Sequence, residues 1–277
     1  MSNYEKKGYL HSDFKLFYLT DNSSEEPDYH YHDFDKIIIF IKGHISYMIE
    51  GRSYDLQPHD IVLVNRNHIH KPFIDNSIPY ERIIIYISRN FIDTYRTDSY
   101  DLSYCFQKAK QEASYVLRFP NTKNNVLLES TVKLERSFRD GDYAHELKQQ
   151  LDVLEFMIYL NRAARKQNLD FVSTSSHNQK IIETIDYINT HLAEDISIES
   201  IARHFYISKY YMMRTFKEVT GYTILDYITM KRMILAKKLI EDNKPLTDVA
   251  LECGYNGYST FYRCFKKFYG YSPKMSH

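Results

Sequence analysis

The last 80 residues contain one sequence pattern twice, and this repeat restricts the fold more than any other feature of the chain. Ala202 in the first copy corresponds to Ala250 in the second, 48 residues later. Three further positions recur 49 residues later: Arg214 as Arg263, Phe216 as Phe265 and Gly221 as Gly270. Because the copies differ in length by only one residue, this region must build one supersecondary unit twice.

Each copy has the pattern of a helix-turn-helix unit. A first helix carries an alanine where two helices approach closely, and a turn follows, which Gly254 marks in the second copy. The second helix begins at Ser208 or at residues 257–259. In such units the second helix presents polar and aromatic side chains to the major groove of DNA, with basic residues further along for phosphates. We predict units at about 198–219 and 246–268.

Two more helices are predicted in this region. Ile181, Ile185, Ile188 and Leu192 form one apolar stripe, so the region begins with an amphipathic helix. Between the two copies, Ile224–Glu241 contains neither glycine nor proline, and a helix of that length spans roughly 27 Å at ~1.5 Å per residue. Successive major-groove segments on one face of DNA lie ~34 Å apart. Such a helix would hold two groove-reading helices about one turn of DNA apart.

The segment from Asp248 to Pro273 resembles the C-terminal signature of the AraC/XylS family of bacterial transcription regulators. The matching residues are Asp248-Val249-Ala250-x-x-Cys253-Gly254-Tyr255-x-x-x-Ser259-x-Phe261-x-Arg263-x-Phe265-Lys266-Lys267-x-x-Gly270-x-Ser272-Pro273. The resemblance extends over about 100 residues, from Gln179 onward. It implies that residues 179–277 form a sequence-specific DNA-binding domain, and it favours activation of transcription over repression.

The resemblance also assigns side chains to DNA. They are Lys209, Tyr210, Met213, Arg214 and Lys217 in the first copy, and Tyr258, Ser259, Tyr262, Arg263, Lys266 and Lys267 in the second. The two arginines are the candidates for base contacts, since a guanidinium can bond O6 and N7 of guanine together. The alternative for each arginine is an intramolecular salt bridge, and for each lysine a solvated helix face. Four aromatic residues are expected in the core: Phe205, Phe216, Phe261 and Phe265.

The charge of the chain is unevenly distributed. Lys and Arg number 36 and Asp and Glu number 36, a balance that by itself argues against a nucleic-acid partner. Residues 209–277, however, hold 12 Lys and Arg against 6 Asp and Glu. This positive end is suited to phosphates, and it disfavours a third hypothesis, that the C-terminal helices are only a protein-interaction module.

The N-terminal half predicts antiparallel β-structure, because short segments rich in Ile, Val, Tyr and Phe alternate with turns. The predicted strands are Phe14–Leu19, Lys36–Ile41, His44–Ile49, Arg52–Leu56, Ile61–Val64 and Arg82–Ser88. Without intervening helices these strands favour a small barrel or sandwich. The His30-Tyr-His32 sequence, the turns at Gly43 and Gly51, and the segments Pro58–Asp60 and Asn67–Pro72 are similar to the cupin-type sensing barrel of many AraC/XylS members. We assign residues 1–120 to such a barrel.

Two amphipathic helices are predicted after the barrel, over 126–138 and 146–167. Their apolar stripes either cover the barrel or leave part of the second helix free to pair with another chain. We assign residues 121–167 to dimerisation, with four candidate contacts: Leu147, Leu151, Leu154 and Ile158. Residues 168–178 lose the periodicity and gain Ser, Thr and Asn, which predicts a linker.

Three histidines support an alternative function. His30, His32 and His70 have the spacing of a metal-binding barrel, and imidazole nitrogens suit Fe, Mn, Ni or Zn. The alternative is a cupin-type metal-dependent enzyme. The acid that usually completes such a site falls near Lys36, whose ammonium would repel a cation. We therefore expect no metal and no other cofactor, and predict that the histidines and Tyr86 line a cavity for a small-molecule effector, a sugar being one candidate. The alternative for the histidines is a place on the rim of the barrel without a binding role.

No other catalytic group is predicted, because the chain has no glycine-rich phosphate loop, nucleophile elbow or Cys-x-x-Cys motif. The longest apolar runs have five residues, far short of the ~20 that cross a bilayer, and the N-terminus lacks an apolar signal core. Three scattered cysteines do not form a paired disulfide framework, so Cys105, Cys253 and Cys264 are interpreted as reduced thiols. These features indicate a cytoplasmic protein with no membrane partner.

The combined hypothesis is an α+β protein with a cupin-like antiparallel β-barrel, flanking helices and an all-α C-terminal domain. In that domain a long helix joins two helix-turn-helix units. The expected function is sequence-specific transcription regulation by a homodimer that binds promoter DNA and responds to a small-molecule effector. If the protein is an activator, RNA polymerase is a further partner. We do not expect an enzyme.

Overall fold

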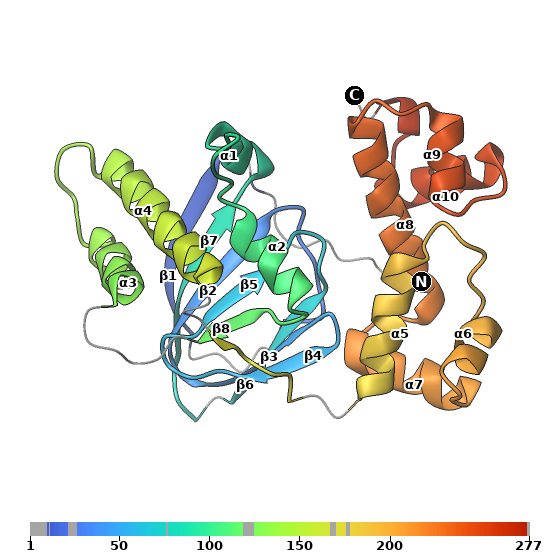
Figure 1. Ribbon diagram of the computed structural model, residues 1–277, viewed down its shortest axis with the longest axis horizontal. Coiled ribbons are helices and arrows are strands. Elements are labelled where there is room, and N and C mark those ends of the chain that lie inside the picture. The colour runs from blue at the N-terminus through green and yellow to red at the C-terminus, as the bar shows by residue number, and fades with distance from the viewer. Residues whose placement is uncertain are drawn as a thin grey trace. The chain divides into compact units, whose positions relative to one another are not determined.

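A computed structural model of the chain describes residues 10, 12–21, 27–75, 77–118, 125–166, 170–175 and 178–275. The chain forms two compact units that divide between Ser176 and His177. The N-terminal unit carries the β-sheets, and the regular structure described in the C-terminal unit, yellow to red in Figure 1, is helical. These two units confirm the predicted α+β class. Among the described helices, none combines the length and the hydrophobicity that a membrane span requires.

The described residues of the N-terminal unit form two antiparallel sheets. The strands are β1 Phe14–Asp21, β2 Asp35–Lys42, β3 His44–Ile49, β4 Arg52–Asp55, β5 Ile61–Val64, β6 His70–Asp75, β7 Tyr80–Ile87, β8 Val116–Arg118 and β9 Asp170–Phe171. The larger sheet has the order β1-β7-β2-β5-β8-β9, and the smaller has the order β4-β3-β6. All six predicted strands are present, with ends within two residues of the prediction. Three strands, β6, β8 and β9, were not predicted.

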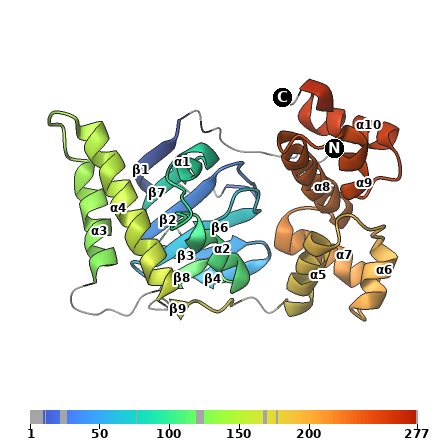
Figure 2. The same ribbon diagram turned by 45° about the horizontal axis from the view of Figure 1, so that its top comes forward.

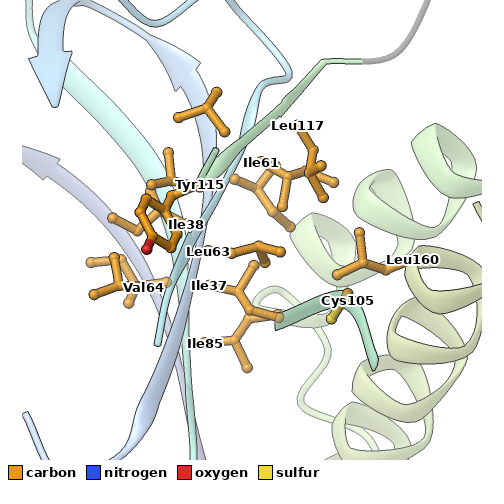
Figure 3. Close-up of a cluster of buried hydrophobic side chains, with 14 of the residues drawn as sticks. Ile37, Ile38, Ile61, Leu63, Val64, Ile85, Cys105, Tyr115, Leu117 and Leu160 are labelled. Carbon is orange, nitrogen blue, oxygen red and sulfur yellow. The ribbon is translucent and has the colours of Figure 1, made fainter. Parts of the chain in front are cut away.

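The centre of the larger sheet explains why β2 is apolar on both faces. Ile37 pairs with Leu63 on one side and with Ile85 on the other. These three side chains lie on the side of the sheet that faces Cys105 and Leu160, as Figure 3 shows. Alternate residues of the same strands, including Ile38 and Val64 in Figure 3, lie on the opposite face. A strand that is covered on both faces has a continuous apolar run instead of alternation.

Four helices accompany the sheets in the part of the unit that the structure describes: α1 Arg89–Thr94, α2 Tyr104–Gln111, α3 Val126–Ser137 and α4 His145–Arg165. Both views place α4 between α3 and the larger sheet (Figures 1 and 2). The side chains of α4 that join the core are Val153, Phe156, Met157, Leu160 and Ala164. The predicted stripe is a different one. Leu147, Leu151 and Ile158 are 56%, 53% and 41% exposed, and only Leu154 packs against the core.

The segment predicted as a linker, 168–178, is not irregular throughout. Its strand β9 pairs with β8 at the edge of the larger sheet. Further along, the Thr174 hydroxyl accepts from the Ser53 backbone N–H (3.1 Å) and the Ser175 backbone N–H donates to the Ser53 carbonyl (2.8 Å). Residues 170–175 therefore belong to the N-terminal unit. A two-residue strand has too few side chains to produce a periodic pattern, so β9 could not be predicted from the sequence.

The C-terminal unit contains six α-helices and one short 3₁₀-helix in the region described. They are α5 Gln179–Thr190, α6 Ile198–His204, α7 Lys209–Thr220, α8 Ile224–Glu241, α9 Leu246–Glu252, α10 Tyr258–Tyr269 and the 3₁₀-helix Pro273–Met275. The long helix α8 has the predicted bounds. Its Tyr227 ring packs against Phe216 of α7, with the centroids 5.3 Å apart, and its Met233, Ala236 and Ile240 join the core around α9 and α10. This helix therefore joins the two helix-turn-helix units.

Candidate DNA-binding helices and histidine cluster

The two helix-turn-helix units have the same turn geometry. At the end of α6, Tyr206 adopts a left-handed conformation (φ 53°), and the Ile207 N–H donates to the Ala202 carbonyl (3.0 Å). At the end of α9, Gly254 is left-handed (φ 76°), and the next N–H donates to the Ala250 carbonyl (3.0 Å). This is a Schellman motif, which ends a helix and satisfies its last carbonyl groups. The sequence repeat is therefore also a structural repeat.

Gly254 is restricted by its surroundings as well as by its backbone angle. A Cβ atom at this position would lie 2.4 Å from the Leu192 carbonyl oxygen and 2.6 Å from Arg232 Nη2. Arg232 itself holds the loop after α5, because its Nε donates to the Leu192 carbonyl (3.0 Å) and its Nη2 to the Glu194 carbonyl (2.6 Å). The second turn thus packs against backbone, and only glycine fits there. Tyr206, its counterpart, is 90% exposed and meets no such limit.

Helix α7 buries one face and exposes the residues predicted to contact DNA. Met212, Thr215 and Phe216 face the core. The exposed residues include all five predicted ones: Lys209, Tyr210, Met213, Arg214 and Lys217. They recur three or four residues apart and so share one side of the helix. Tyr210 is 77% exposed and Met213 is 42% exposed.

Helix α10 has the same division. Phe261 and Phe265 are buried. Among the predicted DNA contacts, Ser259, Arg263, Lys266 and Lys267 are exposed, whereas Tyr258 and Tyr262 are half-buried with their ring centroids 6.1 Å apart. The predicted core residues Phe216, Phe261 and Phe265 are fully buried, and Phe205 is half-buried against the Tyr187 ring.

The basic side chains of α7 and α10 differ in whether they form ion pairs within the protein. Lys209 pairs with Glu199, and Arg214 Nε bonds to Glu218 Oε1 (3.0 Å). Arg214 thus forms an intramolecular salt bridge, which was the alternative predicted for it from the sequence. Because both groups of that pair are more than half exposed, it contributes little to stability and does not prevent a contact with DNA. Within the described part of the chain, four cations of the two helices form no ion pair: Lys217, Arg263, Lys266 and Lys267.

In the N-terminal unit, the three predicted histidines lie together. His30 and His70 form a β-bridge in which each backbone N–H donates to the other's carbonyl (3.2 and 2.9 Å). The ring centroids lie 4.3 Å apart for His30 and His70, 5.0 Å for His30 and His32, and 4.9 Å for His32 and His70. One nitrogen from each ring lies within 4.8 Å of the other two. All three residues are buried.

Aromatic rings and a buried lysine surround this cluster. Tyr86 contacts it, with its ring centroid 5.9 Å from that of His32 and 4.5 Å from that of Phe34. Lys36 Nζ donates to the Tyr47 hydroxyl (3.4 Å) and lies 6.0 Å from the Tyr86 ring centroid. Burial, with a smaller contribution from Arg82, lowers the pKa of Lys36 to about 7. Burial and the nearby Lys36 hold the pKa of His70 well below its usual value.

Asp35 is also buried, but its carboxylate accepts a hydrogen bond from the Arg66 backbone N–H (2.8 Å), and burial raises its pKa. Two of the cavities on the described surface lie away from the histidines. The larger, of about 990 Å³, lies along α4, and the smaller, of about 460 Å³, lies beside β3 and β6. Residues lining the larger one include Tyr95, Tyr100, Tyr104, Arg162 and Arg165. The sequence pattern gave no sign of it, because these residues come from separate segments.

Comparison with known families gives two matches. Residues 17–122 match the AraC-like ligand binding domain, and residues 201–275 match a helix-turn-helix domain. The two matched ranges lie in the N-terminal and the C-terminal unit respectively.

Individual relatives agree with these matches. The "probable transcriptional regulator LumQ" of Photobacterium leiognathi is 25% identical over 262 residues, which are 92% of this chain and 94% of LumQ. The regulatory protein SoxS of Escherichia coli K12 is 33% identical over 99 residues, 35% of this chain and 92% of SoxS. A similar solved structure is the DNA-binding domain of AdpA in complex with a target DNA, at 26% identity, 34% and 86% coverage, and a TM-score of 0.33.

The enzyme alternative receives no support from these relatives, which are regulators. The chain contains both parts of an AraC-type regulator, in the predicted order, and its two helix-turn-helix units are built as the sequence repeat requires. The chain therefore belongs to the AraC/XylS family of transcription regulators, with an N-terminal ligand-binding domain and a C-terminal DNA-binding domain.

Proposed function

We propose that the chain binds promoter DNA by placing α7 and α10 in successive segments of the major groove. The observation that carries this proposal is the matched pair of helices, each with one buried apolar face and one exposed face that holds cations. Helix α8, 18 residues and roughly 27 Å long, joins the two units. Its length approaches the ~34 Å between major-groove segments on one face of DNA.

The proposed contacts divide by chemistry. Arg214 and Arg263 contact bases, and Arg263 is the stronger candidate because it has no carboxylate partner among the described residues. Lys217, Lys266 and Lys267 contact phosphates. Around the start of each helix, the remaining proposed contacts are Lys209, Tyr210, Met213, Tyr258, Ser259 and Tyr262.

Selection from a random duplex library tests this function. The full chain is incubated with the library at two salt concentrations, and the retained DNA is sequenced. We expect a motif with two blocks about one helical turn apart, and weaker retention at higher salt because lysines and arginines displace counterions from phosphates. Retention without any enriched motif, or without dependence on salt, would contradict the proposal.

We also propose that the chain is a homodimer in which α4 is the contact. This proposal is supported by the exposed apolar residues Leu147, Leu151 and Ile158, which continue along one side of the helix while the opposite side enters the core. Large apolar side chains in a row on a surface are typical of an interaction site. Sedimentation velocity of the full chain tests the oligomeric state.

We propose that the N-terminal domain binds an effector around four residues, His30, His32, His70 and Tyr86. The protein as a whole is proposed to regulate transcription in the bacterial cytoplasm, where the promoters are. Effector binding would change the affinity of the protein for DNA through its different affinity for two conformations. An activator of this kind would also contact RNA polymerase. In vitro transcription from a selected promoter, with and without the chain, distinguishes activation from repression.

A further inference from the structure

Two of the three histidines, His30 and His70, form the bridge between β6 and the segment before β2, and backbone carbonyls fix the orientation of their rings. His30 Nδ1 lies 2.7 Å from the Asp28 carbonyl oxygen, and His70 Nδ1 lies 3.0 Å from the His68 carbonyl oxygen. A carbonyl oxygen only accepts, so in both rings Nδ1 must carry the proton and donate it. The neutral rings therefore carry their lone pairs on Nε2.

The Nε2 lone pair of His70 is buried and accepts no hydrogen bond from the described residues. His70 is 0% exposed, and its Nε2 has no hydrogen-bond partner among the described residues. A buried polar atom without a partner costs free energy and calls for an explanation. Around it, one nitrogen from each of the three histidines lies within 4.8 Å of the other two. In His30 and His70 the hydrogen bond from Nδ1 to a backbone carbonyl leaves the lone pair on Nε2. Several nitrogen lone pairs this close together attract a cation.

The donor set selects the kind of cation. Imidazole nitrogens suit first-row transition ions such as Zn²⁺, Co²⁺ and Ni²⁺, whereas Ca²⁺ and Mg²⁺ require oxygen ligands. A metal-binding histidine binds the ion through one ring nitrogen and usually donates the N–H of the other nitrogen to a carboxylate, a backbone carbonyl or water. His30 and His70 both have such a hydrogen bond. The residues present thus fit a transition ion.

We propose that His30, His32 and His70 bind one divalent transition-metal ion, and that this ion is the effector of the N-terminal domain. The second half of the statement rests on the proposed function. The ion would connect the segment that precedes β2 to the first residue of β6, two parts of the chain that are otherwise joined there by the His30–His70 backbone bridge. The proposal replaces the organic effector that the sequence alone suggested.

Titration of the full chain with Co²⁺ after treatment with a chelator tests the site. We expect one Co²⁺ per chain, with visible absorption bands of cobalt bound by nitrogen and without a sulfur-to-cobalt charge-transfer band. Replacing His70 by Gln is expected to weaken binding by at least about 100-fold, since even outer-shell changes cost 10–100-fold. His44→Gln is the matched control, because His44 lies in the same domain and its side chain is 62% exposed.

Two further measurements keep the test decisive if His70→Gln fails to fold. Lys36→Met removes a positive charge beside the cluster and is expected to tighten Co²⁺ binding about tenfold. Zn²⁺ is expected to raise the melting temperature of the unmodified chain in a concentration-dependent way. Absence of Co²⁺ binding, thiolate coordination, or equal affinity in the unmodified chain and in a folded His70→Gln variant would overturn the site.

The effector role is tested with DNA from the library selection. The affinity of the unmodified chain for DNA is expected to change at least about fivefold with Zn²⁺, and that of His70→Gln is expected to stay constant. Equal affinity with and without metal would overturn the effector role while leaving the DNA-binding function in place. If the unmodified chain binds Co²⁺ but shows no specific DNA binding in the library selection, the proposed function is contradicted and the metal site is not.

Discussion

At the residue scale, Gly254 is constrained both by the turn that the repeat requires and by the residues that pack against that turn. Both turns of the repeat need a left-handed residue, but only the second packs against the Leu192 carbonyl and Arg232. The first copy can therefore keep Tyr206 there, at the cost of a less favourable backbone conformation. Identical turn geometry does not imply identical constraints on sequence.

Replacing Gly254 by Ala is expected to lower the free energy of unfolding of the C-terminal unit by at least about 2 kcal/mol. The left-handed conformation alone costs a residue with a Cβ atom about 1–2 kcal/mol, and the new methyl group would also overlap the Leu192 carbonyl. Urea denaturation followed by circular dichroism gives the value. Gly270→Ala is the control, since Gly270 has φ +81° but no atom within 4 Å of a new Cβ. Equal losses in both variants would show that packing at Gly254 is unimportant.

Arg263 is the residue on which sequence preference is expected to depend most. Arg263→Ala should weaken binding to the selected motif by ~1–3 kcal/mol and relax the preference at one base pair. Fluorescence anisotropy with the selected duplex and its single-base variants measures both effects. Lys110→Ala, an exposed lysine of the N-terminal unit, is the control and should change neither. A uniform loss on every duplex would assign Arg263 to a phosphate contact.

At the element scale, the two recognition helices begin differently although they have the same length. The Ser208 hydroxyl accepts a hydrogen bond from the Tyr211 N–H and caps α7, whereas the N-cap residue of α10 is Gly257, which has no side chain to cap the helix. Ser208→Ala should therefore reduce the free energy of unfolding by about 1 kcal/mol, and Ser208→Gly by only a few tenths. Chemical denaturation of the three proteins measures this order. A Gly variant as unstable as the Ala variant would exclude capping as the cause.

Helix α4 has two apolar sides, and only one of them enters the core. If the exposed side is the dimer contact, Leu151→Asp should convert the dimer to a monomer, because it would bury an unpaired charge in the interface. Sedimentation velocity at several concentrations reports the change. Val126→Asp, on an exposed residue of α3, should leave the dimer intact. A dimer that survives Leu151→Asp would place the contact elsewhere.

At the scale of the whole molecule, the net charge of zero is the sum of a positive C-terminal unit and a negative N-terminal unit. Residues 178–277 hold 14 Lys and Arg against 11 Asp and Glu, and the remaining acids outnumber the remaining bases. We expect DNA contacts to be confined to the C-terminal unit. The full chain, as a dimer, should then show about twice the salt dependence of affinity that the fragment 178–277 shows. Equal slopes for the two proteins, measured by filter binding, would mean that only one C-terminal unit touches DNA.

The sequence alone was sufficient for the C-terminal unit because its signals are local. The bounds of α8 were predicted without error from the absence of glycine and proline, and Gly254 marked a turn that the structure contains. Caps, left-handed glycines and the spacing of apolar residues act within a few positions along the chain. The repeat doubled each of these signals, so both helix-turn-helix units could be identified.

Only the tertiary structure decided matters that depend on distant segments. The sequence of α4 allows two apolar stripes, and contact with the sheet selects the one that contains Phe156 and Leu160. His30 and His70 are 40 residues apart in the chain, and the strand pairing brings their rings to a centroid distance of 4.3 Å. The hydrogen bonds that orient those rings also come from folded backbone. Such contacts require several strands to pair at once, and no single stretch of sequence encodes that pairing.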